Sequence, residues 1–194
     1  MIALVSHAGK KVVVRKVVLL SMALLLIAAI AGSGQLRPAI TDDNVQADVF
    51  FSPRGGCTDA VVSTISQAKS EILVQAYSFT SAPIAKALVD AHKRGVQVKI
   101  ILDRSQRKER YSSADFTAHA GIRTFIDAAH AIAHNKVMII DKAVLITGSF
   151  NFTKAAEEKN AENLLVLRSK ELARGYVENW QWHKEHSERY GGRN

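Results

Sequence analysis

The order of hydrophobic and polar positions divides the chain after residue 44 into alternating strand-like and helix-like segments. Short apolar runs bounded by polar turns predict four strands, at residues 45–51, 72–79, 96–102 and 122–126. Amphipathic spacing predicts three helices between or beside them, at residues 58–69, 83–94 and 112–121. This alternation is typical of an α/β fold, and we expect a mixed, largely parallel central sheet with helices on both faces.

A β-hairpin is predicted in the second half of the chain, and it is the element that makes the sheet mixed. Residues 137–140 and 143–146 are continuous apolar runs of the kind found in buried strands. The pair Asp141 and Lys142 between them is typical of a tight turn. Three further elements complete the predicted domain: a short helix from Thr153, a strand over 163–167 and a long helix from Ser169.

Polar side chains with a two-residue spacing flank this hairpin. His134 and Lys136 stand at its beginning, and successive side chains of an extended strand alternate faces, so we expect both to project from the same side. A nucleophile or acid/base beside a fixed positive charge suits attack on a phosphodiester. Ser149 and Asn151 repeat the spacing and can donate hydrogen bonds to phosphate oxygens, while Gly148 lets a ligand approach the backbone closely.

Together these residues read H-x-K-x4-D, followed by G-S-x-N and a later acid. The pattern resembles the HKD motif of the phospholipase D superfamily, and it is most similar to the short, single-motif bacterial Nuc-type endonucleases. The resemblance extends from residue 45 to the C-terminus. It implies a phospholipase D-like fold and a phosphohistidine formed on His134, with Lys136, Ser149 and Asn151 binding the phosphate.

The two acidic residues of the pattern have different expected roles. Glu162 is the candidate acceptor that orients the His134 ring and stabilises its cationic form; the alternative is a surface ion pair with Lys159. Asp141 is seven residues from His134, so along a regular strand it points to the opposite face. We therefore expect Asp141 to act structurally at the hairpin turn and not to touch the phosphate.

A single histidine cannot be an unprotonated nucleophile and a protonated acid in the same step, and the chain contains one H-x-K. We therefore expect a twofold homodimer in which two pairs of His134 and Lys136 share one site. The alternative is that His119 or His130 supplies the acid within one chain. His130 is four positions before His134, about 13 Å along a straight strand, which makes His130 too distant to serve the same phosphate.

The sequence shows no evident metal-ligand set. His130 and His134 would share one face of a helix, but the apolar residues around them indicate a strand, and no acidic cluster suggests a two-metal nuclease. We therefore expect neither a metal nor any other cofactor.

A basic segment follows the third predicted strand, at an edge where open α/β sheets often bind ligands. It contains Arg104, Arg107, Lys108 and Arg110. These side chains suit contacts with a nucleic-acid backbone, and a solvated loop is the alternative.

The N-terminal region differs in composition from the rest of the chain. Residues 1–31 combine a basic segment with an apolar run that ends in small residues, which predicts a secretory signal peptide, with an uncleaved anchor as the alternative. Residues 32–44 form a polar linker, and residues 45–194 form one catalytic domain. Loss of residues 1–31 removes four positive charges and lowers the formal net charge from +8 to +4. The single cysteine, Cys57, excludes an intramolecular disulfide.

These features favour a secreted, periplasmic, metal-independent endonuclease of low sequence specificity that acts on DNA or RNA and does not stay on the membrane after signal cleavage. No base-reading element is recognisable in the sequence. The alternative enzyme is a phospholipase D-type phosphodiesterase that acts on phospholipids. A third hypothesis is a nucleic-acid-binding protein without catalytic activity. The complete set of polar motif residues argues against it.

Overall fold

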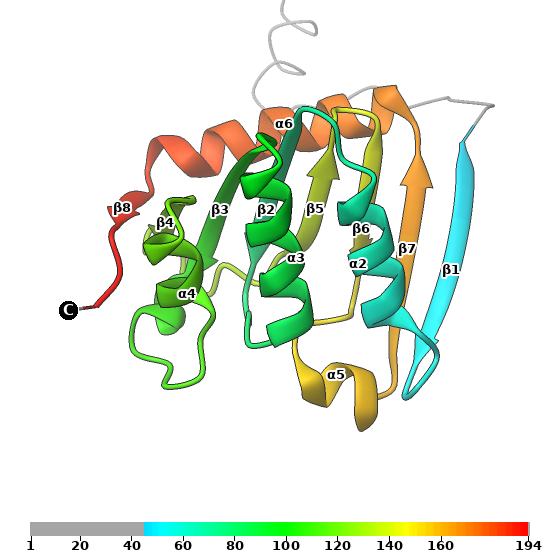
Figure 1. The fold of residues 1–194 in the computed structure, drawn as a ribbon, viewed down its shortest axis with the longest axis horizontal. Coiled ribbons are helices and arrows are strands. Elements are labelled where there is room, and N and C mark those ends of the chain that lie inside the picture. Colours follow the sequence, from blue (N-terminus) through cyan, green and yellow to red (C-terminus); the bar gives the residue numbers. More distant parts are fainter. Residues whose placement is uncertain (1–44, 194) are drawn as a thin grey trace, which may run out of the picture. The chain divides into compact units, whose positions relative to one another are not determined.

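One open mixed sheet organises the domain, with its strands in the order β1-β7-β6-β5-β2-β3-β4-β8 (Figure 1). The structure is a computed structural model that describes residues 45–193. Within them the strands are β1 (Gln46–Ser52), β2 (Glu71–Ala76), β3 (Gln97–Asp103), β4 (Arg123–Asp127), β5 (Lys136–Ile140), β6 (Val144–Gly148), β7 (Glu162–Arg168) and β8 (Glu188–Tyr190).

Helices cover both faces of the sheet, as the sequence predicted. They are α2 (Cys57–Ser66), α3 (Ala82–Lys93), α4 (Ala114–His119), α5 (Lys154–Glu158), α6 (Lys170–Glu185) and the short 3-10 helix η1 (Arg104–Arg107). Figure 1 shows α2, α3 and α4 on one face and the long helix α6 across the other.

Strand β2 shows why the central strands carry apolar residues on both faces. Ile72 and Val74 pack into the larger core beneath α2 and α3, whereas Leu73 packs into a second core under α6. Trp180 of α6 is fully buried in that second core, and its indole nitrogen donates a hydrogen bond to the carbonyl of Val74 at 2.9 Å. Burial on both faces explains continuous hydrophobic runs where a half-exposed strand would alternate.

The mixed α/β architecture is confirmed, but the sheet is less parallel than the sequence predicted. Only the β2–β3 and β3–β4 pairs are parallel, and the other five pairs are antiparallel. Parallel neighbours need a long crossover connection, which α3 supplies between β2 and β3, and η1 with α4 supplies between β3 and β4. A tight turn joins β5 to β6, and such a connection produces antiparallel pairing.

This topology collects several strand ends at one edge of the sheet. The carboxyl ends of β2, β3, β4 and β6 lie there, and so do the amino ends of the oppositely directed β5 and β7. Ala76 therefore pairs with Lys136, and Gly148 pairs with Leu164. Side chains from segments that are distant in sequence therefore lie close together at this edge of the sheet.

The predicted signal peptide and linker, residues 1–31 and 32–44, lie outside the described residues. Between residues 45 and 193, none of the helices has the length and apolar character needed to cross a membrane.

Candidate active site

A cavity of about 360 Å³ lies at this edge of the sheet. It is lined by the motif residues His134, Lys136, Gly148, Ser149, Asn151 and Glu162. The structure therefore brings together every motif residue predicted to contact or assist at the phosphate. Asp141, expected to act elsewhere, is not part of the lining.

His134 lies in the loop of residues 128–135 that precedes β5, and not in a strand as the sequence suggested. Its side chain is exposed, and its ring packs against the ring of Tyr77 with 4.6 Å between centroids. The Lys136 ammonium donates a hydrogen bond to the carbonyl oxygen of His134 at 2.8 Å. His134 is thus held by its backbone and one ring contact, and its ring remains accessible to a ligand.

Lys136 is the first residue of β5 and is buried. Burial lowers the pKa of its amine below the ordinary lysine value, and the negative charge of Glu162 partly opposes this shift. The Lys136 nitrogen also lies 5.2 Å from the centroid of the Tyr77 ring, a favourable cation–π distance. A lysine held in this way supplies a positive charge at a defined point of the cavity.

The hydroxyl oxygen of Ser149 accepts hydrogen bonds from the backbone and side-chain nitrogens of Asn163, at 3.0 and 3.4 Å. Because Ser149 is the acceptor in both, its own hydrogen can be donated to a bound phosphate. The Oδ1 atom of Asn151 is buried and has no hydrogen-bond partner among the described residues. An amide oxygen only accepts hydrogen bonds, so the predicted donor to the phosphate is the amide nitrogen of Asn151.

Gly148 has no side chain because the neighbouring strand β7 leaves no room for one. Its φ angle is +145°, and a Cβ atom at this position would lie 2.3 Å from the carbonyl oxygen of Asn163. The predicted reason, close approach of a ligand to the backbone, is therefore incomplete. Only glycine allows β6 to end against β7 at this point.

Glu162 begins β7 and lines the same cavity as His134. We call residues 128–135, the loop that carries His134, the HKD loop. Its carboxylate accepts a hydrogen bond from the Asn160 side chain at 3.1 Å and forms no ion pair with Lys159 among the described residues. No hydrogen bond joins Glu162 to His134 in this part of the chain, so the orienting role stays a prediction. The negative charge of Glu162 acts instead on Lys136, where it opposes the lowering of the pKa by burial.

Asp141 lies at the turn between β5 and β6, as predicted. Asp141 and Lys142 both have positive φ angles, 51° and 53°, as a type I′ hairpin turn requires. The Asp141 carboxylate accepts hydrogen bonds from the backbone nitrogens of Lys69, Ser70 and Glu71, at 2.8 to 3.0 Å, and from the Ser70 hydroxyl. The aspartate of the motif therefore fastens the hairpin to the start of β2, at the edge opposite the cavity.

We expect Asp141→Asn to lower stability at pH 7 by about 2 kcal/mol, since bonds to a charged acceptor are lost. The substitution keeps the shape of the side chain, and asparagine tolerates the positive φ angle. Burial would raise the pKa of Asp141, but its hydrogen bonds lower it overall. The carboxylate therefore stabilises the fold above its unfolded pKa of about 3.9, and this contribution disappears as the pH falls through the lower folded value.

Urea unfolding at several pH values measures this effect. The difference between wild type and Asp141→Asn should shrink in acid, while Glu178→Gln, at an exposed position of α6, should change little at any pH. A difference that does not depend on pH would show that the charge of Asp141 is unimportant.

Two buried aspartates hold the HKD loop. Asp103 and Asp127 end β3 and β4 and pair in the sheet register. One oxygen of Asp103 accepts a hydrogen bond from the backbone nitrogen of Ala133 at 2.8 Å, and Asp127 accepts one from Ala129 at 3.1 Å. The loop that carries His134 is thus anchored at both of its ends to the carboxyl edge of the parallel strands.

The predicted basic segment falls on η1 and the loop that follows it. Arg104, Lys108 and Arg110 are exposed. Arg107 instead forms an ion pair with Glu188 at 2.7 Å, so it fastens β8 to η1. The three exposed side chains remain candidates for contact with a polyanion.

A larger cavity, about 780 Å³, lies between α3 and α4. It is lined by residues such as Pro83, Val89, Tyr111 and Phe116 and contains none of the motif residues. Size alone therefore does not locate the chemistry. The smaller cavity is the candidate active site because it holds the charged and hydrogen-bonding groups.

Comparison with known proteins shows the family. Residues 61–184 match the family model described as "Cardiolipin synthase, PLD-like domain". The match covers more than half of the chain, so the chain belongs to the phospholipase D-like family, and the family predicted from the HKD motif is confirmed.

Particular relatives agree with this family. A protein named phospholipase D from Rickettsia bellii is 48% identical over 130 residues, which are 67% of this chain and 65% of the relative. Nuc from Salmonella typhimurium, a phospholipase D family member, is 42% identical with a TM-score of 0.73, over 76% of this chain and 99% of Nuc. NucT from Helicobacter pylori is 25% identical with a TM-score of 0.71, over 76% of this chain and all of NucT. The chain thus spans about two thirds of the length of the Rickettsia relative.

Several residues around the site were not predicted. Tyr77, which contacts both His134 and Lys136, follows β2 directly, and only its place at the carboxyl end of a strand could have indicated a role. Nothing in the sequence groups His130 with Asp127, because the pattern around His130 predicts a strand. In the structure His130 lies beside Asp127 and two histidines at the end of α6, and not beside His134.

Proposed function

We propose that this protein is a secreted endonuclease that hydrolyses phosphodiester bonds of DNA or RNA with low sequence specificity. The observation that carries the proposal is the cavity in which an accessible imidazole, a buried ammonium, a hydroxyl and an amide converge. A phosphodiester needs a nucleophile, a proton donor for the leaving oxygen and positive charge at the phosphoryl oxygens. His134, Lys136, Ser149 and Asn151 supply the first and third of these from side chains alone.

In this mechanism a ring nitrogen of His134 attacks phosphorus, and the bond to one ester oxygen breaks. The leaving alkoxide takes a proton from an acid, and the phosphoryl group remains on His134 as a phosphohistidine. A water molecule then attacks phosphorus, the P–N bond breaks, and the water proton returns to the group that gave up its own. Lys136 and Ser149 stabilise the charge on the non-bridging oxygens in both steps.

The acid is proposed to be His134 of a second copy of the chain. Within residues 45–193, His134 is the only histidine that lines the cavity. His130 is hydrogen-bonded to Asp127 in a separate cluster, and His119 lies on α4, so neither alternative is placed to serve. A twofold dimer that brings two cavities together supplies one neutral and one protonated histidine.

Mixing subunits tests this arrangement. Wild-type chains are exchanged with increasing fractions of His134→Asn chains, and nuclease activity is measured at constant total protein. A shared site needs both histidines, so activity should follow the square of the wild-type fraction. A linear decline would show that each chain holds a complete site of its own.

The names of the relatives point to two different classes of substrate. Nuc and NucT favour a nucleic acid, whereas the Rickettsia relatives are named phospholipase D. The exposed side chains of Arg104, Lys108 and Arg110 favour an extended polyanion. Phospholipid hydrolysis is the second candidate, because the same cavity chemistry serves any phosphodiester.

A direct assay separates the candidates. The purified protein is incubated with plasmid DNA, with RNA and with phosphatidylcholine vesicles, without added divalent cations and in excess EDTA. Cleavage of nucleic acid alone supports the proposal, and cleavage of lipid alone supports the second candidate. Binding to nucleic acid without cleavage of either substrate would indicate an idle site.

Export to the periplasm through removal of residues 1–31 is part of the proposal, and the mature domain would then not stay on the membrane. The basic and apolar character of that segment supports it. The intact mass of the exported protein tests it, because a mass that still includes residues 1–31 in the membrane fraction would indicate an anchor instead.

A further inference from the structure

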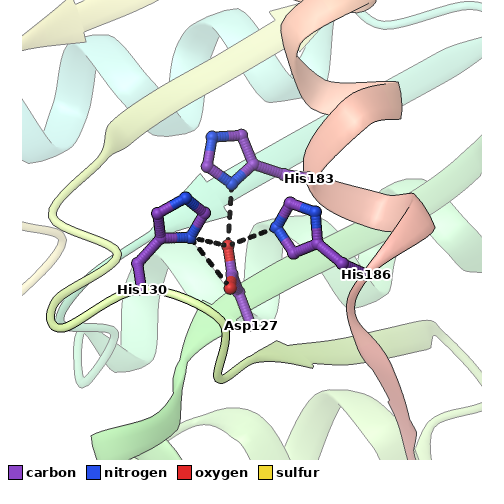
Figure 2. A group of neighbouring side chains, drawn as sticks. All are labelled: Asp127, His130, His183 and His186. Carbon is purple, nitrogen blue, oxygen red and sulfur yellow. Dashed lines mark hydrogen bonds and ion pairs between the residues drawn. The ribbon is translucent and has the colours of Figure 1, made fainter.

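A second cluster of polar side chains lies outside the candidate active site. It consists of Asp127, His130, His183 and His186, and one potential ligand atom from each lies within 4.8 Å of the other three (Figure 2). None of the four lines the cavity that contains His134.

Three imidazole nitrogens converge on a single carboxylate oxygen of Asp127. The Nδ1 atoms of His183 and His130 lie 2.7 and 3.1 Å from Asp127 Oδ2, and the Nε2 atom of His186 lies 3.4 Å from it. Figure 2 shows the three rings arranged around the carboxylate from different directions. His130 Nδ1 also lies 3.2 Å from Asp127 Oδ1, so this ring is shared between the two oxygens of the carboxylate. Three imidazole nitrogens and a carboxylate gathered at one point are the ligands that transition metals prefer.

The cluster is well placed for an ion. Asp127 is fully buried and His183 is nearly so, whereas His130 and His186 are partly exposed. A buried carboxylate needs a positive charge or hydrogen-bond donors beside it.

We propose that Asp127, His130, His183 and His186 form a binding site for a divalent transition metal, with Zn²⁺ as the favoured ion. Neutral imidazole suits Zn²⁺, Ni²⁺, Co²⁺ and Cu²⁺, while Ca²⁺ and Mg²⁺ prefer oxygen ligands. Zn²⁺ binds histidine nitrogen and carboxylate oxygen at about 2.1 Å in a tetrahedron, which separates neighbouring ligand atoms by about 3.4 Å. Side-chain shifts on the order of 1 Å convert the observed spacing into this geometry.

Four protein ligands fill a tetrahedral zinc ion and leave no open position, so the site is structural. It joins three segments: Asp127 ends β4, His130 belongs to the HKD loop, and His183 and His186 lie at the end of α6. His130 is four residues before His134. The ion therefore fixes the loop of the proposed nucleophile to the C-terminal helix, and it takes no part in chemistry at the phosphate.

Trp182 supplies a local reporter. Its ring centroid lies 4.8 Å from those of His183 and His186 and 5.6 Å from that of His130, and the side chain is 53% exposed. A paramagnetic ion such as Cu²⁺ in the cluster would quench its fluorescence. Trp182→Phe should remove most of this quenching without removing a ligand.

The test uses the full chain without a histidine tag, stripped of metal with a strong chelator and titrated with Zn²⁺ against a chromophoric competitor. We expect one Zn²⁺ per chain, a melting temperature that rises with Zn²⁺, and visible bands typical of tetrahedral coordination when Co²⁺ replaces Zn²⁺. His186→Ala and His130→Ala should each weaken Zn²⁺ binding by about 100-fold or more. His119→Ala, which removes an exposed histidine on α4, should not.

Absence of stoichiometric Zn²⁺ binding by the wild-type chain, or equal affinity in the wild type and both ligand variants, would overturn the proposal. The Co²⁺ spectrum and the zinc titration of the wild-type chain decide the question even if a ligand variant fails to fold. Both are read without substrate, so this result is independent of the proposed nuclease activity. Stripping the ion should lower the melting temperature, while cleavage at temperatures well below it should persist.

Discussion

Replacing His134 with asparagine should abolish phosphodiester cleavage and leave the fold intact. The expected loss is on the order of 10⁴-fold or more, because without the nucleophile only binding and charge stabilisation remain. The side chain of His134 is exposed, and its described ring contact is with Tyr77. The backbone carbonyl that accepts the Lys136 hydrogen bond is unchanged by the substitution. Single-turnover cleavage of a labelled oligonucleotide measures the effect, with thermal unfolding as the check on folding.

The matched control is His119→Asn, a change at an exposed histidine on α4. It should retain wild-type activity, which separates loss of the nucleophile from loss of any imidazole. Full activity in a well-folded His134→Asn protein would refute the phosphohistidine mechanism.

Lys136→Ala should reduce kcat by about 10²- to 10³-fold, or roughly 3–4 kcal/mol, the range for removal of one well-placed donor to a developing oxyanion. The ammonium is buried at the wall of the cavity, where a charge acts more strongly than in water. Glu162 is the anion that raises the pKa of Lys136 against the effect of burial. The net pKa is still lowered, so activity that needs the charged form should fail at a lower alkaline pH than an ordinary lysine would allow.

The control for this substitution is Lys142→Ala, which removes an exposed lysine at the opposite end of β5. Lys142 has a positive φ angle, so a modest loss of stability is expected there, but no loss of turnover. Lys136 also donates to the carbonyl of His134, so unfolding should be measured for both variants. A loss of only about tenfold in Lys136→Ala would show that another positively charged group neutralises the phosphate.

Local sequence was sufficient to predict much of the domain. The uninterrupted apolar run at 137–140 predicted a strand buried on both faces, and β5 is such a strand. Residues 72–79 were predicted as a strand, and β2 lies within the region 71–79. The separation of seven residues between His134 and Asp141 predicted that Asp141 acts at the hairpin turn and does not touch the phosphate, and Asp141 lies in that turn. These inferences succeed because the period of a strand and the chemistry of a turn depend on neighbouring residues only.

Strand order could not be read in the same way. The sequence predicted a largely parallel sheet with one antiparallel hairpin, β5–β6. Outside that hairpin, the pairs β1–β7, β6–β7, β2–β5 and β4–β8 are antiparallel as well. A sequence shows where a helix connects two strands. Which strand the chain then pairs with, and in which direction, depends on packing between distant residues. The requirement for Gly148 likewise depends on the backbone of Asn163 in the next strand.

The sequence by itself determined the identity of the reactive groups and their local spacing: a histidine and a lysine two residues apart, a serine and an asparagine with the same spacing, and a turn between them. Only the tertiary structure decided what else surrounds them. Tyr77 meets His134 and Lys136 because β2 and β5 are neighbours, and Asp127 meets His183 because α6 crosses the sheet to the end of β4. These pairs are separated by more than fifty residues, and no local periodicity encodes a contact that arises from the order of strands and the path of a helix.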